Sequence, residues 1–441
     1  MCPTSAPDLP QQSKLSEGRS GLRVLSLFSG CGGLDLGFEE QGFETAFCVE
    51  WDYEACKTIR HNRPNWPLHE GDIRVFVDVA RDVQDVQGVI GGPPCQGFSP
   101  AGKGNPNDPR NTLWREYFRL VRETHPEFIL LENVPGMLHA KNRPHLDALV
   151  AAFEDLGYII SFGVLNAADF GVPQNRKRLI VTGGLGFRIP LPKPSHKNPV
   201  TVRSAIQDLE NNSSVPNHLP NKHAPDVVER WSKLAEGESD PGYRRSRLHA
   251  DRPSTTLRAG GGYGPSGNHL GGFHPPIHYR FPRQLTVRES ARIQGFPDSW
   301  VLKGSKTAQG RQVGNAVPPP LASAIAGACL NATIAHRAGT TPPELPGEKH
   351  TETTAKAALK LLGDDERTAV EAWIDDRECP VCETPAALEW EPVRSVRGQE
   401  YVLQPTVLHA LTSKQECVSL GDTTLCAPIR TPAVLPPQVG P

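Results

Sequence analysis

Nine residues, GGPPCQGFS from Gly91 to Ser99, hold a thiol in a backbone with little freedom. Pro93 and Pro94 each fix a φ angle, and the flanking glycines leave room for a partner to approach Cys95 closely. The apolar pair Val89–Ile90 before the loop predicts the end of a buried strand. Cys95 is therefore a candidate nucleophile, although most cysteines are simply small buried hydrophobic residues.

A nucleophilic thiol needs a proton donor and positive charge nearby, because a free thiol is mostly protonated at neutral pH. The buried strand expected at Phe128–Leu131 delivers Glu132 at its end, where parallel sheets bind ligands. Arg176 and Arg178 lie two residues apart, before a strand expected at Leu179–Thr182. On a strand they would project to the same side and could hold the acid, a carbonyl oxygen or a phosphate. A surface carboxylate and a solvated basic turn are the alternatives.

The N-terminal part of the chain has the pattern of a nucleotide-binding unit. A strand expected at Gly21–Phe28 runs into a turn containing Gly30 and Gly33, followed by a helix at Leu34–Gln41. Strand, glycine-rich turn and helix form the Rossmann arrangement, in which N–H groups at the helix start face an anionic group.

Polar groups after the next strands favour a nucleoside ligand. Glu50 ends the strand expected at Thr45–Val49 and suits ribose hydroxyls, Trp51 could cover a purine ring, and Asp72 could accept from an exocyclic amine. The turn is not a clean GxGxxG, so it fits a nicotinamide dehydrogenase, a nucleoside-binding transferase or a purely structural turn. The acid, Trp and Asp together favour adenosine without a pyrophosphate, as in S-adenosylmethionine.

Composition sets the class of protein. The chain has 441 residues, of which 37% are hydrophobic, so it can bury a full enzyme core. Its ten cysteines are scattered, the N-terminus is polar, and we see no stretch that resembles a membrane span. We therefore expect a cytoplasmic protein with reduced thiols and no membrane partner.

Charge is distributed unevenly along the chain. The formal net charge is −2, but residues 241–312 hold twelve Lys/Arg and three acids, a net of +9. This segment predicts contact with nucleic-acid phosphates, and a solvated basic face is the alternative. Residues 341–441 carry sixteen acids and nine bases, a net of −7.

These patterns divide the chain into five parts. Regularity is poor after residue 186, where one strand is expected at Ser254–Arg258. It returns with the capping box Thr286-x-x-Glu289 and with Gln312–Val317, which precede a proline-started helix at Pro319–Ala335. The expected parts are a disordered stretch 1–20, a catalytic domain 21–186 plus 313–335, an irregular recognition domain 187–312, a linker 336–355 and an acidic domain 356–441. In the last part, Cys379, Cys382, Cys417 and Cys426 are zinc candidates, although ordinary thiols are the larger expectation because the second gap is unusual.

The ordered motifs resemble those of the DNA cytosine-5 methyltransferase family of bacterial restriction-modification systems. The resemblance covers residues 22–186 and 285–330, and residues 187–283 correspond only in position, as the variable target-recognition domain. The motifs are FSGCGG, VEWD, EGDI, GGPPCQGFS, LLENV, QNRKR, RESARIQGFPD and QVGNAVPPP. The implied fold is α/β, a Rossmann-like S-adenosylmethionine-dependent methyltransferase sheet with a smaller target-recognition domain and an appended C-terminal region.

The resemblance implies a role for each site residue. Cys95 would attack carbon 6 of a flipped cytosine in duplex DNA, Glu132 would contact ring nitrogen 3 and the amine, and Arg178 would hold the carbonyl and orient Glu132. Arg176 falls at the family's other site arginine. The positions that would contact S-adenosylmethionine are Phe28, Gly30, Gly33, Glu50, Trp51, Asp72 and Asn315.

Competing functions remain open at this point. They are an RNA methyltransferase with the same motifs, a non-enzymatic DNA-binding regulator and a nicotinamide dehydrogenase, which gives no reason for GGPPCQGFS. The intact Cys95, Glu132, Arg176 and Arg178 argue against the regulator. We expect a monomer that acts on double-stranded DNA, with a cognate restriction endonuclease acting independently.

Overall fold

The computed structural model describes most of the N-terminal three quarters of the chain. The described ranges are residues 21–76, 83, 85–94, 113–140, 142–212, 214–242, 245–259, 273 and 275–340, and beyond them the backbone of four short strands. Cys95, residues 1–20 and the four zinc candidates lie outside these ranges. The roles predicted for them therefore stay predictions.

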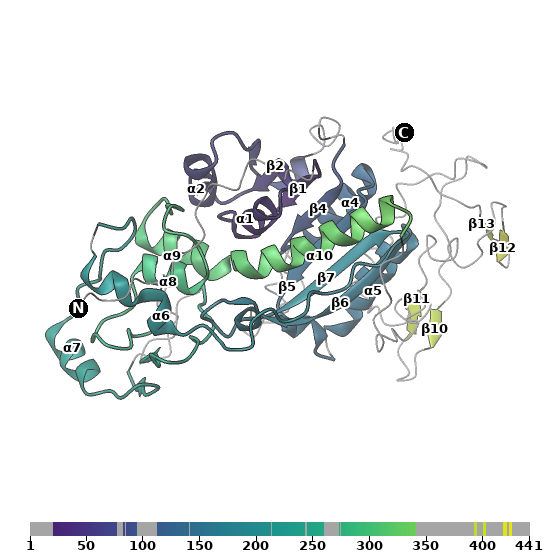
Figure 1. The fold of residues 1–441 in the computed structure, drawn as a ribbon. Helices are drawn as coiled ribbons and strands as arrows, with labels where there is room; N and C mark the ends of the chain where they lie inside the picture. The colour runs from purple at the N-terminus through teal and green to yellow at the C-terminus, as the bar shows by residue number, and fades with distance from the viewer. Residues whose placement is uncertain are drawn as a thin grey trace, which may run out of the picture.

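A seven-stranded sheet forms the centre of the larger part of the protein (Figure 1). Its strand order is β3-β2-β1-β4-β5-β7-β6, and β7 runs antiparallel to both of its neighbours. The strands are β1 (Arg23–Leu27), β2 (Glu44–Glu50), β3 (Leu68–Glu70), β4 (Gly88–Gly91), β5 (Phe128–Asn133), β6 (Tyr158–Asn166) and β7 (Lys177–Leu185). The predicted α/β class is confirmed, and the expected strands lie within a few residues of the observed ones.

Helices cover both faces of this sheet because its strands alternate between two apolar cores. In β5, Ile129 and Leu131 belong to one cluster, whereas Phe128 and Leu130 belong to the other. The first cluster includes residues of α4 (Leu113–Thr124) and α5 (Arg143–Asp155), and the second includes residues of α1 (Gly33–Glu40) and α10 (Pro319–Arg337). The remaining elements of this part are α2 (Tyr53–Asn62) and the 3₁₀ turns η1 (Ile73–Val75), η3 (Pro135–Leu138) and η4 (Ala167–Phe170).

The long helix α10 crosses the sheet beside α1 (Figure 1). A Cβ atom at Gly37 of α1 would lie 2.4 Å from the Cβ of Ala322, so the two helices touch at a point where only small residues fit. Together with α9, the segment Lys306–Arg337 is long and apolar enough to cross a bilayer, but 61% of its apolar window is buried inside the protein. It is thus placed as a core helix.

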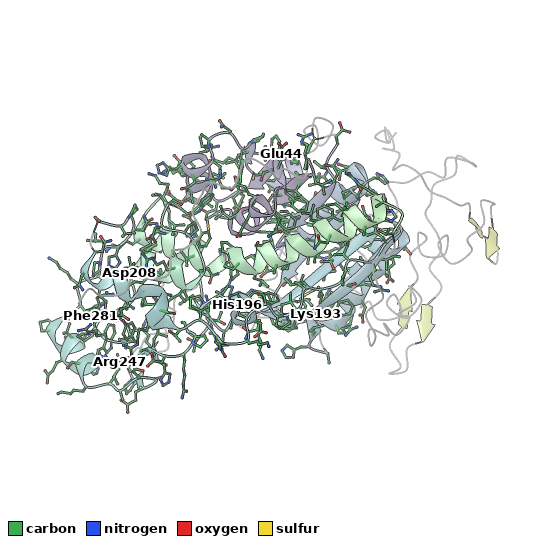
Figure 2. The ribbon with its side chains drawn as sticks, in the orientation of Figure 1. Glu44, Lys193, His196, Asp208, Arg247 and Phe281 are labelled. Atoms are coloured by element: carbon green, nitrogen blue, oxygen red, sulfur yellow. The ribbon has the colours of Figure 1, made fainter. Side chains whose placement is uncertain are left out.

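The region between β7 and α10 is built from short elements and loops, as expected. These are α6 (Val202–Ile206), η5 (Gln207–Asn211), α7 (Pro225–Ser232), β8 (Ser239–Asp240), β9 (Arg245–Ser246), α8 (Val287–Ile293) and α9 (Lys306–Asn315). The capping box predicted at Thr286 and Glu289 is present at the start of α8. Figure 2 shows the side chains of Asp208, Arg247 and Phe281 gathered in this region. Further along the chain lie the short strands β10 (Pro392–Arg394), β11 (Glu400–Val402), β12 (Val418–Leu420) and β13 (Thr423–Leu425).

Two local predictions are wrong here. The strand expected at 254–258 is reduced to a single bridge between Ser254 and Gln174, because side chains rather than a neighbouring strand satisfy the backbone of Leu257. Gln312–Asn315, expected to lie outside a helix, form the last turn of α9. Its glycines and weak apolar periodicity hide this helix, but Ser305 caps its start by accepting from the backbone N–H of Ala308.

Candidate active site

Five of the predicted site residues lie at one edge of the sheet: Phe28, Glu50, Asp72, Glu132 and Arg178. The register pairs Leu27 with Val49 and with Gly91, and Glu50 with Glu70, so the parallel strands end together. The residues just after β1, β2, β3, β4 and β5 therefore face a common crevice.

Glu50, at the end of β2, accepts three backbone hydrogen bonds. One carboxylate oxygen accepts from the backbone N–H of Gly30 at 2.7 Å, and the other accepts from those of Trp51 and Asp52 at 3.0 and 2.7 Å. Burial raises the pKa of Glu50, and the three N–H donors oppose that shift. The carboxylate thus ties the glycine turn to the end of β2.

The turn after β1 has a backbone that the sequence alone could not specify. Phe28 has a φ of 56°, which is uncommon for a residue with a side chain, and Gly30 and Gly32 have φ values of 57° and 82°. A Cβ at Gly33 would lie 2.4 Å from the carbonyl oxygen of Val317, whereas a Cβ at Gly30 would meet nothing within 4 Å. Gly33 is needed for packing, and Gly30 faces open space where a ligand can approach.

The other predicted cofactor residues lie on separate elements. Trp51 is 77% exposed, an unusual degree for an indole ring. Asp72 caps η1 and forms an ion pair with Arg74, which lowers the pKa of the Asp72 carboxyl. Asn315 is exposed at the end of α9. An exposed indole, an open glycine turn and anchored acids fit an adenosine-containing ligand.

The catalytic half brings Glu132 and Arg178 together. The Nε of Arg178 lies 2.8 Å from Oε1 of Glu132, and their side chains are 13% and 12% exposed. The antiparallel course of β7 explains this contact, because Asn133 pairs with Leu179 and the start of β7 therefore lies beside the end of β5. A Cβ at Gly92 would lie 3.0 Å from Oε2 of Glu132, so the Gly-Pro-Pro loop passes directly over this acid.

Arg176 is placed differently from Arg178. It is 0% exposed and its guanidinium donates to the backbone carbonyl oxygens of Leu257, Gly314 and Ala316. Burial lowers its pKa. The two arginines therefore have different partners, since Arg178 holds Glu132 whereas Arg176, just before β7, holds Leu257 and the backbone on either side of Asn315.

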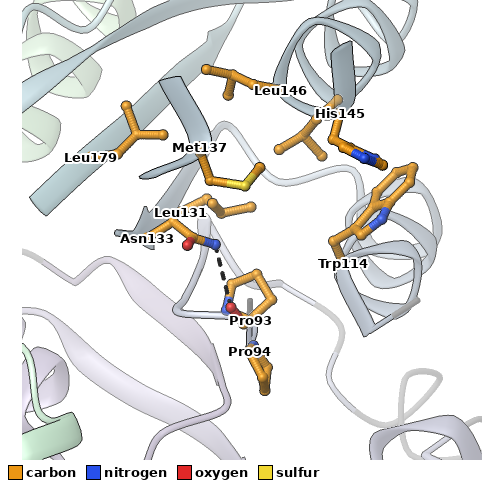
Figure 3. Close-up of a pocket in the computed structure, with 10 residues that line it drawn as sticks. Pro93, Pro94, Trp114, Leu131, Asn133, Met137, His145, Leu146 and Leu179 are labelled. Atoms are coloured by element: carbon orange, nitrogen blue, oxygen red, sulfur yellow. Dashed lines mark hydrogen bonds between the residues drawn. The ribbon is translucent and has the colours of Figure 1, made fainter. Parts of the chain in front are cut away.

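Asn133 is a site residue that the sequence reasoning did not single out. Its Nδ2 donates to the carbonyl oxygen of Pro93 at 3.4 Å (Figure 3). Its Oδ1 accepts from the N–H of Val134 at 2.7 Å. Its place directly after Glu132, in the run LLENV, is the signal that could have found it. Asn133 links the acid's strand to the loop that leads to Cys95.

A mostly apolar pocket lies behind this loop (Figure 3). Its lining residues are Pro93, Pro94, Trp114, Leu131, Asn133, Met137, His145, Leu146, Leu149 and Leu179. Within the described ranges, no group of three or more His, Cys, Asp or Glu side chains could hold a metal ion. The chemistry available is that of a carboxyl–guanidinium pair at the sheet edge that also carries the glycine turn and Glu50.

Comparison with known proteins shows which family this chain resembles. Residues 22–331 match the family described as C-5 cytosine-specific DNA methylase. The Type II methyltransferase M1.HphI of Haemophilus parahaemolyticus is 38% identical over 334 residues, 70% of this chain and 87% of that protein. The Type II methyltransferase M.NgoPII of Neisseria gonorrhoeae is 37% identical over 327 residues, 70% of this chain and 95% of that protein.

Solved structures agree with the sequence comparison. A DNA modification methyltransferase encoded within an Escherichia coli prophage is similar with a TM-score of 0.61 and 29% identity, covering 71% of this chain and 100% of that chain. The S. pombe Dnmt2 methyltransferase shares the fold, with a TM-score of 0.52 and 19% identity over 71% of this chain and 99% of that chain. The chain therefore belongs to the C-5 cytosine-specific DNA methylase family.

Proposed function

We propose that this protein methylates carbon 5 of a specific cytosine in double-stranded DNA through a covalent adduct with Cys95. S-adenosylmethionine supplies the methyl group. The observation that carries the proposal is the Glu132–Arg178 pair at 2.8 Å beneath Gly92, at the sheet edge that also carries the cofactor residues. The candidate nucleophile Cys95 follows Gly92 by three residues in the sequence.

The proposed chemistry balances with the groups present. The Cys95 thiolate adds to carbon 6, and the electron pair moves to carbon 5 while Glu132 donates a hydrogen bond or proton at nitrogen 3. Carbon 5 takes the methyl group, and S-adenosylhomocysteine leaves. A base then removes the carbon-5 proton, and the thiolate is expelled to restore the ring. Such acid assistance is typically worth about 10²–10⁴ in rate.

Arg178 has two tasks in this scheme. Its Nε holds Oε1 of Glu132, which orients the acid, and Nη1 donates to the carbonyl oxygen of Lys177 at 2.7 Å. Nη2 can then donate to the cytosine carbonyl. Asn133 supports the geometry by holding the Pro93 carbonyl. A stacked base cannot reach this edge of the sheet, so the cytosine must be flipped out of the duplex.

We assign recognition of the DNA sequence to the loop-built region 187–312. Relatives named Type II methyltransferases support a restriction-modification role in the cytoplasm, in which a cognate endonuclease acts independently. We also propose that the protein is a monomer, and sedimentation of the full chain tests this.

Cys95→Ala is the direct test. We expect loss of methyl transfer to duplex DNA with DNA binding retained, measured with labelled S-adenosylmethionine and a filter-binding assay. The unaltered protein should also form a stable adduct with 5-fluorocytosine DNA, because fluorine blocks the final elimination. Activity that persists in Cys95→Ala contradicts the assignment of the nucleophile, and transfer to tRNA but not DNA contradicts the assignment of the substrate.

A further inference from the structure

We infer that Arg176 is a positioning residue that fixes Asn315 for the cofactor and joins the recognition region to the cofactor side. The inference rests on the proposed function in one respect, because it takes Asn315 as a contact of S-adenosylmethionine. It assigns Arg176 a different task from Arg178, although both belong to the motif QNRKR.

One guanidinium holds the backbone on both sides of Asn315. Nη2 of Arg176 donates to the carbonyl oxygens of Gly314 and Ala316, each at 2.9 Å. The side chain of Asn315 is exposed while its two neighbours are buried. The backbone that carries the exposed Asn315 side chain is therefore held by a residue that itself has no exposed surface.

The same guanidinium reaches the recognition region. Nη1 of Arg176 donates to the carbonyl oxygen of Leu257 at 3.0 Å. A Cβ at Gly314 would lie 2.4 Å from the backbone nitrogen of Ala259, so the two segments are in backbone contact at this point. Arg258, between these residues, is exposed. The Arg176 side chain thus lies between the segment that carries the exposed Arg258 and the segment that carries Asn315.

Two buried glutamines complete the arrangement. Oε1 of Gln174 accepts from the N–H of Leu257 at 2.9 Å. Both backbone groups of Leu257 are therefore held by side chains that lie just before β7. Nε2 of Gln294 donates to the carbonyl oxygen of Ala316 at 2.6 Å, next to the Arg176 contact. Gln174, Arg176 and Gln294 are all 0% exposed. Four separate segments are bound into one polar network.

The physical requirement for arginine is geometric. A planar guanidinium presents several fixed N–H donors and can serve carbonyl groups on two segments at once. A lysine has one nitrogen on a flexible stem and cannot span them in the same way. A base-contacting arginine must be reachable by the substrate, and Arg176 is not exposed.

Arg176→Lys tests the inference in the full-length protein. We expect S-adenosylmethionine to bind at least about tenfold more weakly by calorimetry without DNA, with a matching rise in its KM. The kcat at saturating cofactor should stay within about threefold. A fall in kcat with unchanged cofactor binding would overturn the inference, because that is the signature of a contact made in catalysis.

Arg247→Lys is the matched control. Arg247 is also buried and donates to carbonyl oxygens, those of Trp231, Tyr279 and Arg280, but it lies within the recognition region. We expect it to lower the thermal midpoint as Arg176→Lys does, and to leave cofactor binding unchanged. Equal losses of cofactor binding in both variants would overturn the inference in favour of a general loss of structure.

A double-mutant cycle with Asn315→Ala tests the connection itself. If Arg176 acts through Asn315, the double variant binds S-adenosylmethionine no more weakly than Asn315→Ala alone. Additive losses would overturn the inference. If Arg176→Lys does not fold, Gln294→Ala takes its place, since it removes one of the two side-chain donors to Ala316 and leaves Arg176 intact.

These measurements also separate the inference from the proposed function. Calorimetry without DNA does not depend on Cys95, on Glu132 or on turnover. Failure of methyl transfer by the unaltered protein would contradict the proposed function, whereas cofactor binding that is indifferent to Arg176 contradicts only the inference.

Discussion

At the scale of single residues, the site depends on pairs of groups that the fold brings close. Glu132 is held by Arg178 and lies under Gly92, and Glu50 is held by three backbone N–H groups. Each carboxylate is thus oriented before any ligand arrives, so little reorganisation is left for the reaction.

Glu132→Gln should separate proton donation from binding. The amide has nearly the same shape but cannot transfer a proton to ring nitrogen 3. We expect kcat to fall by about 10²–10⁴, while binding of DNA and of S-adenosylmethionine changes little. Steady-state methylation assays combined with calorimetry measure this. A wild-type kcat in the variant would remove Glu132 from the proposed chemistry.

Trp51→Ala should affect the cofactor but not the fold. The indole is 77% exposed, so we expect unfolding free energy to change by less than about 0.5 kcal/mol. S-adenosylmethionine should bind about tenfold more weakly, because stacking on the purine is lost. Tyr53→Ala, two residues away and 56% exposed, is the control and should leave cofactor binding unchanged. Equal effects of both changes would contradict a specific stacking role.

At the scale of elements, the glycine turn after β1 is fixed by the residues that pack behind it. Helix α1 begins at Gly33, where the carbonyl of Val317 approaches, and touches α10 at Gly37. The antiparallel strand β7 carries Arg178 to Glu132. The site is therefore sensitive to the spacing of two helices and to the direction of one strand.

Gly37→Ala should destabilise the protein through the α1–α10 contact. The added Cβ would lie 2.4 Å from both the Ala322 Cβ and the Ser323 nitrogen, so the helices must move apart. We expect a loss of about 1–3 kcal/mol in urea unfolding. Gly327→Ala is the control, because its Cβ meets nothing closer than 3.4 Å and alanine favours the helix. A similar loss in both variants would contradict the packing argument.

Asp35→Asn should change how stability depends on pH. Asp35, in the first turn of α1, is 0% exposed, and burial raises its pKa from 3.8 to about 6. The folded state then holds the proton more tightly than the unfolded state, so the stability from this group is lost as pH rises through about 6.

The asparagine variant does not lose this stability. Between pH 5 and pH 8 the unfolding free energy of the unaltered protein should fall relative to Asp35→Asn by about 1.4 kcal/mol. Urea unfolding at the two pH values measures the difference. If the two proteins differ in unfolding free energy by the same amount at both pH values, Asp35 does not titrate in this range.

At the scale of the whole molecule, the basic segment serves the fold as well as any DNA. Many of the cations counted in 241–312 hold the loops together, because irregular backbone leaves carbonyl groups that need donors. Arg247 and Arg288 donate to carbonyl oxygens, Arg283 pairs with Glu289, and Arg292 pairs with Asp298. The net charge of this segment therefore overstates the number of phosphate contacts.

Arg258→Ala and Arg288→Ala should separate the two uses of arginine. Arg258 is exposed, so its removal should weaken DNA binding and reduce the salt slope by about one, with an unchanged thermal midpoint. Arg288 is 0% exposed and donates to Trp300 and Pro297, so its removal should cost about 2–4 kcal/mol of stability. Binding at several salt concentrations and urea unfolding measure these effects. A loss of stability in Arg258→Ala together with a loss of DNA binding but not of stability in Arg288→Ala would contradict this division between DNA-binding and structural arginines.

The sequence by itself determined the α/β class, the class of chemistry and the positions of several buried strands. Buried strands are short apolar runs, and acids such as Glu50 and Glu132 stand at their ends, so local pattern is enough to predict them. The loop-built region was predictable only as irregular, since periodicity carries no information where regular elements are absent.

Only the tertiary structure decided which polar groups meet. Arg176 and Arg178 are alike in sequence, yet one holds three carbonyl oxygens that are distant in the chain and the other holds Glu132. The left-handed backbone at Phe28 and the link from Asn133 to Pro93 are equally non-local. Hydrogen-bond partners far apart in the chain are chosen by packing, and packing is a property of the whole fold.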